Sequence, residues 1–368
     1  MQILQILILI LLLVAQTANA QDTFTGVERV VALGDVHGDY DALVAILRDA
    51  GLVDQKSRWS GGKAHLVQTG DLLDRGPDSR KVMELIITLE KQAAKAGGRV
   101  HSLLGNHEAM NIYGDLRYTS PGEYAAFKTG DSERVRDAFW ERELQAMPRP
   151  PTPEEKKKWE TEHPLGWVEH RMQFGPEGTY GKWLRNKNTL VKINDSVFLH
   201  GGLSAKFAGR SVGQLNAAIR AELKDVSQLK MDSSVLTDPD GPLWYRGLAQ
   251  DAGAEMLPLA IRLTEALGVK RIVIGHTPTP GAVLPRLDGR VIAIDVGMSA
   301  YYGSHRACLV IEGDKLYAMH RGQKIELPGG EAADYLAYVK RVAALEKPTS
   351  LLVKYAAQVE SQLAGPGR

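Results

Sequence analysis

The run Gly-Asp-Leu-Leu-Asp-Arg-Gly at 70–76 constrains the fold of this chain more than any other stretch. It follows an apolar segment at 64–69 that is typical of a buried strand, and its glycines allow a sharp turn where the strand ends. The turn would leave Asp71, Asp74 and Arg75 at the carboxyl edge of a sheet, where open α/β sheets bind their ligands. Two carboxylates and a guanidinium suit a metal and phosphate site. Taken alone, the run is equally compatible with a solvated loop that holds a local Asp–Arg pair.

Four more apolar segments end in the same way, in a glycine-flanked cluster of polar residues. The clusters are Gly34-Asp35-Val36-His37-Gly38, Gly105-Asn106-His107-Glu108, His200-Gly201-Gly202 and Gly275-His276-Thr277. If the strands lie in one layered sheet, all the clusters can meet at one rim. Five clusters of ligand-type side chains, each closing an apolar strand, are hard to obtain by chance. By contrast, His65, His101 and His320 stand alone, and we interpret them as surface residues or satisfied core residues.

The predicted site offers carboxylate, imidazole and amide oxygen ligands and no thiolate. This set suits manganese, iron or zinc better than copper or an iron–sulfur cluster. There are too many ligands for one ion, and the two oxygens of Asp71 can each face a different metal. We therefore assign two divalent metal ions, with Asp35, His37 and Asp71 on the first and Asp71, Asn106, His200 and His276 on the second. Two ions roughly 3.5–4 Å apart can share a deprotonated water as nucleophile and hold the phosphoryl oxygens.

The remainder of the chain predicts an α/β protein of ordinary composition. Its 368 residues are 44% hydrophobic and 24% charged, which is enough for a buried core. Residues 110–185 show no strand pattern and contain a proline-rich stretch at 147–153, so they predict a mostly helical insertion. Residues 326–368 are predicted to form C-terminal helices, and the single cysteine, Cys308, to lie buried in the core. The net charge of +1 provides no global basic field that would attract nucleic acid.

The N-terminus predicts export. Residues 3–14 are almost wholly apolar, which is about the length of a signal-peptide core and too short for a comfortable membrane span. Small residues at 18–20 then supply a cleavage site, so residues 1–20 are predicted to be a signal peptide. The mature protein would be periplasmic or secreted, with no stable membrane span. An uncleaved N-terminal anchor is the alternative, because only the amino group supplies positive charge ahead of the apolar run.

Together, the five clusters resemble the ordered motifs of calcineurin-like metallophosphoesterases. The forms Gly-Asp-x-His-Gly, Gly-Asp-x-x-Asp-Arg-Gly and Gly-Asn-His-Glu are most similar to the phosphoprotein phosphatase branch. Within that branch, the insertion and the segment Gly-Pro-Leu-Trp-Tyr-Arg-Gly at 241–247 resemble the bacterial Shewanella-like protein phosphatases. The resemblance implies an α/β (α+β) fold of two mixed β-sheets sandwiched between helices. It also implies a catalytic domain at 27–325 that contains the helical insertion.

The resemblance implies roles beyond metal binding as well. His107 matches the histidine that donates a proton to the leaving oxygen, and Asp74 matches the carboxylate that orients it. A nearby carboxylate favours the imidazolium form, which suits a proton donor. Arg75 matches a phosphate-binding arginine, whose guanidinium fork suits bidentate contact. Arg246 is a candidate for a second clamp on phosphate, and a surface arginine beside a packed tryptophan is the alternative.

These residues predict a metal-dependent phosphatase that hydrolyses phosphomonoesters through attack of a hydroxide that bridges the metals. Its substrate would be a phosphorylated protein, with phosphotyrosine included, or a small phosphate ester. One departure weakens a serine/threonine preference: residues 295–302 read Asp-Val-Gly-Met-Ser-Ala-Tyr-Tyr where eukaryotic serine/threonine phosphatases carry a Ser-Ala-Pro-Asn-Tyr-Cys-type stretch.

Two alternatives stay open. A phosphodiesterase or dinucleoside polyphosphate hydrolase would share the same motifs. A catalytically silent phospho-ligand binding protein would use the proline-rich insertion to dock a partner. The intact pair of His107 and Asp74 argues against the silent protein.

Overall fold

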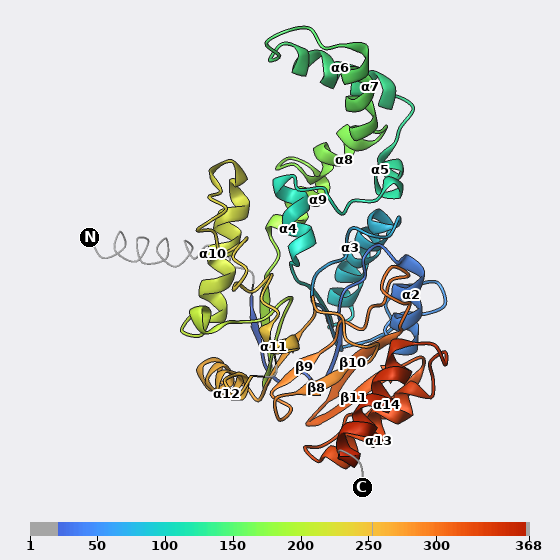
Figure 1. Ribbon diagram of the computed structural model, residues 1–368, viewed down its shortest axis with the longest axis vertical. Helices are drawn as coiled ribbons and strands as arrows, with labels where there is room; N and C mark the ends of the chain where they lie inside the picture. Colours follow the sequence, from blue (N-terminus) through green and yellow to red (C-terminus); the bar gives the residue numbers. More distant parts are fainter. Residues whose placement is uncertain (1–20, 252, 366–368) are drawn as a thin grey trace, which may run out of the picture.

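The computed structural model describes residues 21–251 and 253–365, so the predicted signal peptide at 1–20 lies outside the described residues. Two six-stranded mixed sheets form the centre of the molecule (Figure 1). The first sheet has the order β12 (Gln323–Glu326), β11 (Lys315–His320), β10 (Ala307–Glu312), β2 (Arg29–Leu33), β3 (His65–Gln68) and β4 (Arg99–Ser102). The second has the order β1 (Thr23–Phe24), β5 (Leu190–Ile193), β6 (Ser196–Leu199), β7 (Arg271–Ile274), β9 (Val291–Ala293) and β8 (Leu284–Arg286).

The strands that carry the predicted clusters are divided between the two sheets. β2, β3 and β4 run parallel to one another in the first sheet, and β6 and β7 run parallel in the second. The five strands therefore do not share one sheet, and the fold of two mixed sheets between helices, which the resemblance implies, is confirmed. An apolar strand pattern shows that a strand is buried but does not show which sheet it joins.

Successive residues of β6 and β7 pack on opposite faces of the second sheet, as the two-residue period of a strand requires. Phe198 and Val273 join a large core that also contains residues of the first sheet. Val197 and Ile272 join a smaller core together with residues of α12 (Met256–Leu267). The second sheet is thus covered on one side by the first sheet and on the other by helices.

Helices flank both sheets, as Figure 1 shows. In the first half of the chain they are α2 (Tyr40–Asp49) and α3 (Ser79–Lys95), and α3 packs on β4. Beside the second sheet lie η1 (Ala205–Phe207), α10 (Val212–Lys224), η2 (Val226–Gln228), α11 (Gly247–Gln250) and α12. The C-terminal helices α13 (Ala332–Ala343) and α14 (Leu351–Ala364) pack on each other and add Tyr338, Val339 and Leu352 to the large core.

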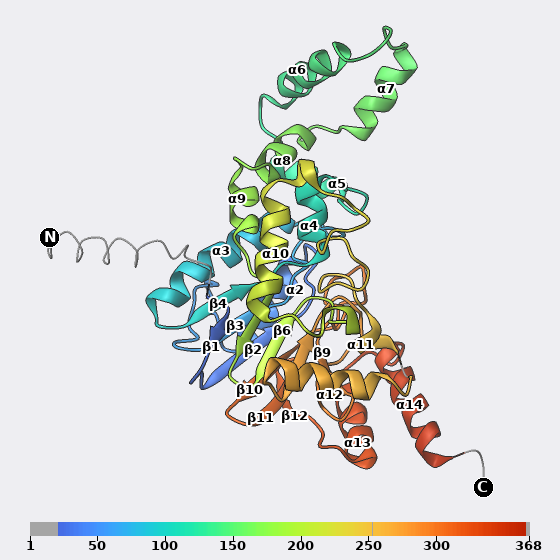
Figure 2. The ribbon, with the colours of Figure 1, turned by 90° about the vertical axis from the view of Figure 1, so that its left-hand side faces the viewer.

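The segment predicted as a helical insertion contains helices and no strand. Its elements are α4 (Asn106–Tyr113), α5 (Pro121–Phe127), α6 (Ser132–Leu144), α7 (Pro153–Glu162), α8 (Trp167–Phe174) and α9 (Thr179–Arg185). Figures 1 and 2 show α6 and α7 as an arm that projects away from the sheets. The proline-rich stretch joins these two helices. Among the described helices, none combines the length and the apolar character needed to cross a bilayer.

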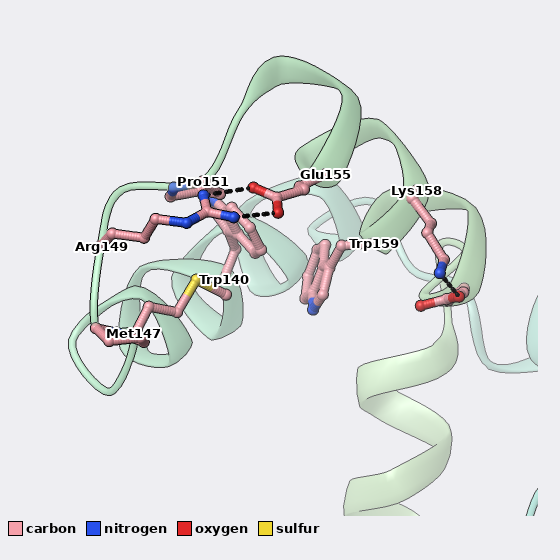
Figure 3. Close-up of a pocket in the computed structure, with 9 residues that line it drawn as sticks. Trp140, Met147, Arg149, Pro151, Glu155, Lys158 and Trp159 are labelled. Carbon is pink, nitrogen blue, oxygen red and sulfur yellow. Dashed lines mark hydrogen bonds and ion pairs between the residues drawn. The ribbon is translucent and has the colours of Figure 1, made fainter.

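The tip of the arm is held together by aromatic packing. Trp140 of α6 and Trp159 of α7 have ring centroids 4.8 Å apart. They line a pocket of about 340 Å³, together with Met147 and Pro151 of the connecting stretch (Figure 3). Across this pocket Arg149 donates to the Glu155 carboxylate, so the polar groups at its rim are already paired. Phe139 of α6 also packs on Trp167 of α8, with ring centroids 5.5 Å apart, and the tip of the arm projects away from the sheets that carry the predicted site.

Candidate metal centre

The predicted cluster residues converge, and Asp71 at the end of β3 lies between them. Its Oδ2 is 3.7 Å from Nε2 of His37 and 3.7 Å from Nε2 of His107. Its Oδ1 is 3.3 Å from Nε2 of His200. A carboxylate whose two oxygens face histidines on opposite sides has the arrangement needed to serve two cations at once.

The second sheet supplies the other side of the centre. His276 joins His200 and Asp71 in a group whose candidate ligand atoms all lie within 4.8 Å of one another. Asn106 Oδ1 is 2.8 Å from His200 Nε2, and Asp35 Oδ1 accepts the backbone N–H of His276 at 3.0 Å. All the predicted ligands are buried, none being more than 4% exposed. Residues separated by up to 241 positions thus form one compact cluster.

Hydrogen bonds fix which ring nitrogen each histidine ligand can offer. The contacts are His37 Nδ1 to the Leu73 carbonyl (2.9 Å), His200 Nδ1 to the Thr69 carbonyl (3.0 Å) and His276 Nε2 to the Trp244 carbonyl (3.1 Å). A carbonyl oxygen can only accept, so each of these nitrogens carries a hydrogen, and the opposite ring nitrogen is the one left to bind a metal. Burial also lowers the pKa of His37 to about 4, which keeps this imidazole neutral. Neutral, oriented imidazoles are the form that binds metals.

Four buried carboxylates surround the predicted metal centre, and their mutual repulsion makes the ionised forms unfavourable. Burial and the charge of Asp295 raise the pKa of Asp35 well above its usual value. Burial likewise raises the pKa of Asp295 to about 6 and that of Glu108 to about 7. Together with Asp71 they concentrate negative charge in a region that water cannot screen. Divalent cations would compensate that charge, so the donor set fits a dinuclear metal group.

The turns that end the strands adopt an uncommon backbone conformation. Residues in the left-handed region include His37 (φ 48°), Asp71 (58°), Asp74 (67°), Arg75 (69°) and His276 (65°). Non-glycine residues rarely adopt this conformation, and it concentrates at functional sites. Gly70 makes the turn after β3 possible, because a side chain there would collide with the backbone of Gly105 after β4. The glycines that mark the motifs therefore allow the strand ends to approach closely enough to share ligands.

His107 and Asp74 form a directly bonded pair beside the metal ligands. Nδ1 of His107 lies 2.5 Å from Asp74 Oδ2, which leaves Nε2 facing Asp71. Burial alone would lower the pKa of His107, but the charges of Asp71 and Asp74 outweigh burial and raise it to about 9. Asp74 is in turn held by Asn111 Nδ2 at 3.1 Å and by the Thr119 hydroxyl at 3.0 Å. The imidazole is thus oriented and charged as a proton donor requires.

The guanidinium of Arg75 is enclosed by aromatic rings. It lies 4.0 Å from the ring centroid of Tyr118 and 4.8 Å from that of Tyr301. Nη1 of Arg75 also donates to the Tyr301 hydroxyl at 3.4 Å. Among the described residues no carboxylate pairs with Arg75, so its charge remains available for an anionic ligand. The neighbouring residue Tyr302 packs instead on a metal-ligand candidate, with its ring centroid 5.2 Å from that of His37.

Arg246 supports the turn that carries His276. Its Nη1 donates to the His276 carbonyl at 2.7 Å and contacts the Thr277 hydroxyl at 3.3 Å. The side chain is nevertheless exposed and borders the centre. Its predicted contact with phosphate stays a prediction.

Two glutamates accept backbone N–H groups of the loops that carry the site residues, and neither was assigned a role from the sequence alone. Glu108 accepts the backbone N–H groups of Asp71 at 2.8 Å and Gly105 at 2.7 Å, which ties the ends of β3 and β4 together. Glu123 accepts the backbone N–H of Asp74 at 3.0 Å. Glu108 belongs to the Gly-Asn-His-Glu motif, so its position was a usable signal. Glu123 lies in the insertion, where its sequence context indicates only a helix N-terminus.

Comparison with known proteins identifies the family to which this chain belongs. Residues 28–280 match the family described as Calcineurin-like phosphoesterase. An uncharacterized protein of Schizosaccharomyces pombe is 34% identical, covering 81% of this chain and 82% of its own length. Shewanella-like protein phosphatase 2 of Arabidopsis thaliana is 29% identical, covering 77% and 75% respectively.

A solved structure agrees with these relatives. The cold-active protein-tyrosine phosphatase of a psychrophilic Shewanella species superposes with a TM-score of 0.66 and 30% sequence identity, covering 83% of this chain and 82% of its own. The family match extends over more than half of the chain, and it includes every strand end that contributes a predicted metal ligand. The chain therefore belongs to the calcineurin-like phosphoesterase family and is a metal-dependent phosphatase.

Proposed function

We propose that this phosphatase hydrolyses phosphomonoesters of proteins, with phosphotyrosine among its substrates, at a centre of two metal ions. The position of Asp71 supports this proposal most strongly, because one oxygen faces His37 and the other faces His200. Asp35, His37 and Asp71 would hold the first ion. Asp71, Asn106, His200 and His276 would hold the second.

Side chains of the protein bind the phosphoryl group and donate the proton to the leaving oxygen. When bound, the two cations supply positive charge that polarises the phosphoryl group and lowers the pKa of water. Arg75 binds phosphoryl oxygens through its guanidinium fork. His107 donates the proton on Nε2 to the leaving oxygen, while Asp74 holds Nδ1 and keeps the ring in place.

Aromatic side chains at the entrance favour an aryl ester as substrate. Tyr118 and Tyr301 flank Arg75, so a phosphate bound there would carry its leaving group between or beside two rings. Aromatic rings stack favourably on one another, by about 0.5–1.5 kcal/mol beyond the area they bury. The name of the Shewanella enzyme, a protein-tyrosine phosphatase, agrees with this preference. The donor set favours manganese, iron or zinc as the metals.

The test is a comparison of substrates with defined metal content. Purified protein loaded with Mn²⁺ is expected to hydrolyse p-nitrophenyl phosphate, to lose this activity in EDTA and to regain it when Mn²⁺ is returned. It should cleave phosphotyrosine peptides and aryl monoesters faster than bis-aryl diesters or diadenosine tetraphosphate. Full activity without metal would overturn the mechanism. Preference for a diester or for the dinucleotide would favour the alternative enzyme, and tight phosphopeptide binding without turnover would favour the silent protein.

We also propose that the protein is exported, because residues 1–20 have the pattern of a signal peptide. The substrates would then be extracytoplasmic phosphoproteins or phosphate esters. Cell fractionation and N-terminal mass measurement are expected to find a periplasmic or secreted chain that begins at Gln21. A full-length chain in the membrane fraction would indicate an uncleaved anchor, and a purely cytosolic protein would overturn the proposal.

A further inference from the structure

Glu346, near the C-terminus, has a buried carboxylate that three basic side chains contact. Its side chain is only 2% exposed. Nε and Nη2 of Arg321 donate to its two oxygens at 2.7 and 2.8 Å. Nε2 of His320 lies 2.9 Å from Oε1, and Nδ1 of His305 lies 3.4 Å from Oε2. Glu346 follows α13, so it belongs to the C-terminal helical segment and not to the sheets that hold the metal ligands.

These basic groups hold one end of a loop at residues 297–305, here named the tyrosine loop. Nη2 of Arg321 donates to the carbonyl of Ser304 at 3.0 Å, while it also donates to Glu346. The backbone N–H of His305 closes the loop by donating to the carbonyl of Gly297 at 3.1 Å. One acid therefore fixes the base of the loop through Arg321, and it also lies within ion-pair distance of His305.

The His305 ring fits only because glycines surround it. A Cβ at Gly281 would lie 2.6 Å from its Nδ1, and a Cβ at Gly303 would lie 2.8 Å from its Nε2. The ring thus fills a slot between the loop and the turn before β8 and turns its Nδ1 toward Glu346. Packing this tight transmits a shift of the ring to the backbone of the loop.

The tip of the same loop faces substrate. Tyr301 lies against the Arg75 guanidinium, and Tyr302 lies against the His37 ring. Within the loop, the backbone N–H groups of Tyr302 and Ser304 both donate to the Ser299 carbonyl at 3.0 Å. The N–H of Ala300 ties the tip to another segment by donating to Asp39 Oδ2 at 3.1 Å. Tyr301 itself is 63% exposed, so few contacts of its own fix its ring. Its position depends on how firmly the base of the loop is held.

We propose that Glu346 is a positioning residue: by holding Arg321, which in turn holds Ser304, it sets Tyr301 against Arg75 and thereby shapes the binding site for the leaving group of the substrate. The proposal rests on the proposed role of Arg75 in binding phosphate. It assigns to the C-terminal segment, which lies beyond the family match at 28–280, a part in substrate binding. Glu346 touches no reacting atom and acts only through the tyrosine loop.

The experiment combines Glu346→Gln with Tyr301→Ala in a double-mutant cycle on the full chain. Glu346→Gln keeps the shape of the side chain and removes the charge that three basic groups share. Because an aromatic contact contributes about 0.5–1.5 kcal/mol, the KM for p-nitrophenyl phosphate should rise about twofold to tenfold, with little change in kcat. The KM for glycerol phosphate, which has no ring to stack, should change less. In the Tyr301→Ala background, Glu346→Gln should have almost no further effect on KM.

Tyr338→Phe provides the matched control. The Tyr338 hydroxyl donates to the Val283 carbonyl at 2.7 Å, which anchors α13 to the turn before β8 and not to Arg321 or residues 297–305. This variant removes one buried hydrogen bond from the C-terminal segment, so it shows how a general destabilisation of that segment affects KM. It should leave both KM values unchanged. If Glu346→Gln does not fold, Arg321→Lys replaces it, since lysine keeps the charge but cannot donate to Glu346 and Ser304 with the same fork.

Hydrogen exchange gives a readout that does not depend on activity. Amides at 299–305 should exchange faster in Glu346→Gln than in the natural protein or in Tyr338→Phe. Unchanged exchange in the loop, or equal and additive KM effects in both Tyr301 backgrounds, would overturn the inference. If the natural protein hydrolyses no phosphate ester at all, the proposed function fails, while the exchange result still decides whether Glu346 holds the loop.

Discussion

Asp71→Asn is expected to lower kcat toward p-nitrophenyl phosphate by roughly a thousandfold or more. Both oxygens of Asp71 face histidines, so an amide in its place offers one oxygen and no charge to a site that needs both. Metal ions contribute several kcal/mol to such reactions, and about 4 kcal/mol corresponds to roughly 10³ in rate. Steady-state kinetics measures the rate. Elemental analysis of the purified protein should show fewer bound ions per chain than in the natural protein.

Asp78→Asn is the matched control for this substitution. Asp78 follows the same motif, but its carboxylate is directed to Lys81 at 2.7 Å and is 36% exposed. Its loss should leave both activity and metal content nearly unchanged, since exposed ion pairs contribute little. Thermal unfolding of both variants separates a damaged site from a damaged fold. An Asp71→Asn protein that keeps its metals and its full rate would refute the shared-ligand assignment.

His107→Gln is expected to reduce activity in a way that depends on the leaving group. General acid catalysis contributes about 10²–10⁴ in rate when the leaving oxygen needs a proton. Alkyl phosphates should lose about that much. p-Nitrophenyl phosphate should lose far less, because p-nitrophenolate leaves without protonation. A plot of log kcat/KM against the pKa of the leaving group should therefore become steeper in the variant.

His163→Gln tests whether any histidine loss has this effect. His163 stacks on Trp159 in the projecting arm, with ring centroids 4.3 Å apart, and is remote from the centre. Its replacement should leave the dependence on the leaving group unchanged. If His107→Gln slowed all substrates equally, the role of His107 would have to be assigned to metal binding or to folding instead of proton donation.

The parts of the site that could be predicted from sequence are those encoded within a few neighbouring residues. A strand, its closing glycine and the ligand after it lie together in the chain, as at β3, Gly70 and Asp71. The helix after the motif, Ser79–Lys95, is also encoded locally, because Val82, Ile86 and Leu89 recur at helical spacing on its buried face. The single cysteine is buried, as its apolar context predicts. His65 and His101 lie in the core and bond to each other at 3.0 Å, which agrees with their interpretation as satisfied core residues.

The parts that could not be predicted depend on contacts between distant segments. Arg75 and Tyr301 are 226 positions apart, and no local pattern links them. Glu123 reaches Asp74 only because α5 docks against the motif loop. The pattern of a single strand likewise does not show which of the two sheets it joins, because tertiary packing decides that; the two-sheet fold itself was implied by the family resemblance. The domain boundaries at 27–325 and the assignment of each ligand to one ion stay predictions.

The division of the ligands between two sheets has a consequence for how the protein matures. Asp35 and Asp71 emerge early from the ribosome, but His276 lies three quarters of the way along the chain, and the two sheets must dock before the ligands face one another. A nascent or truncated chain that stops short of β7 lacks His276 and so cannot form the complete ligand set proposed for the second ion. On the proposed assignment, the second ion would therefore bind only after β7 has joined the second sheet and the two sheets have docked.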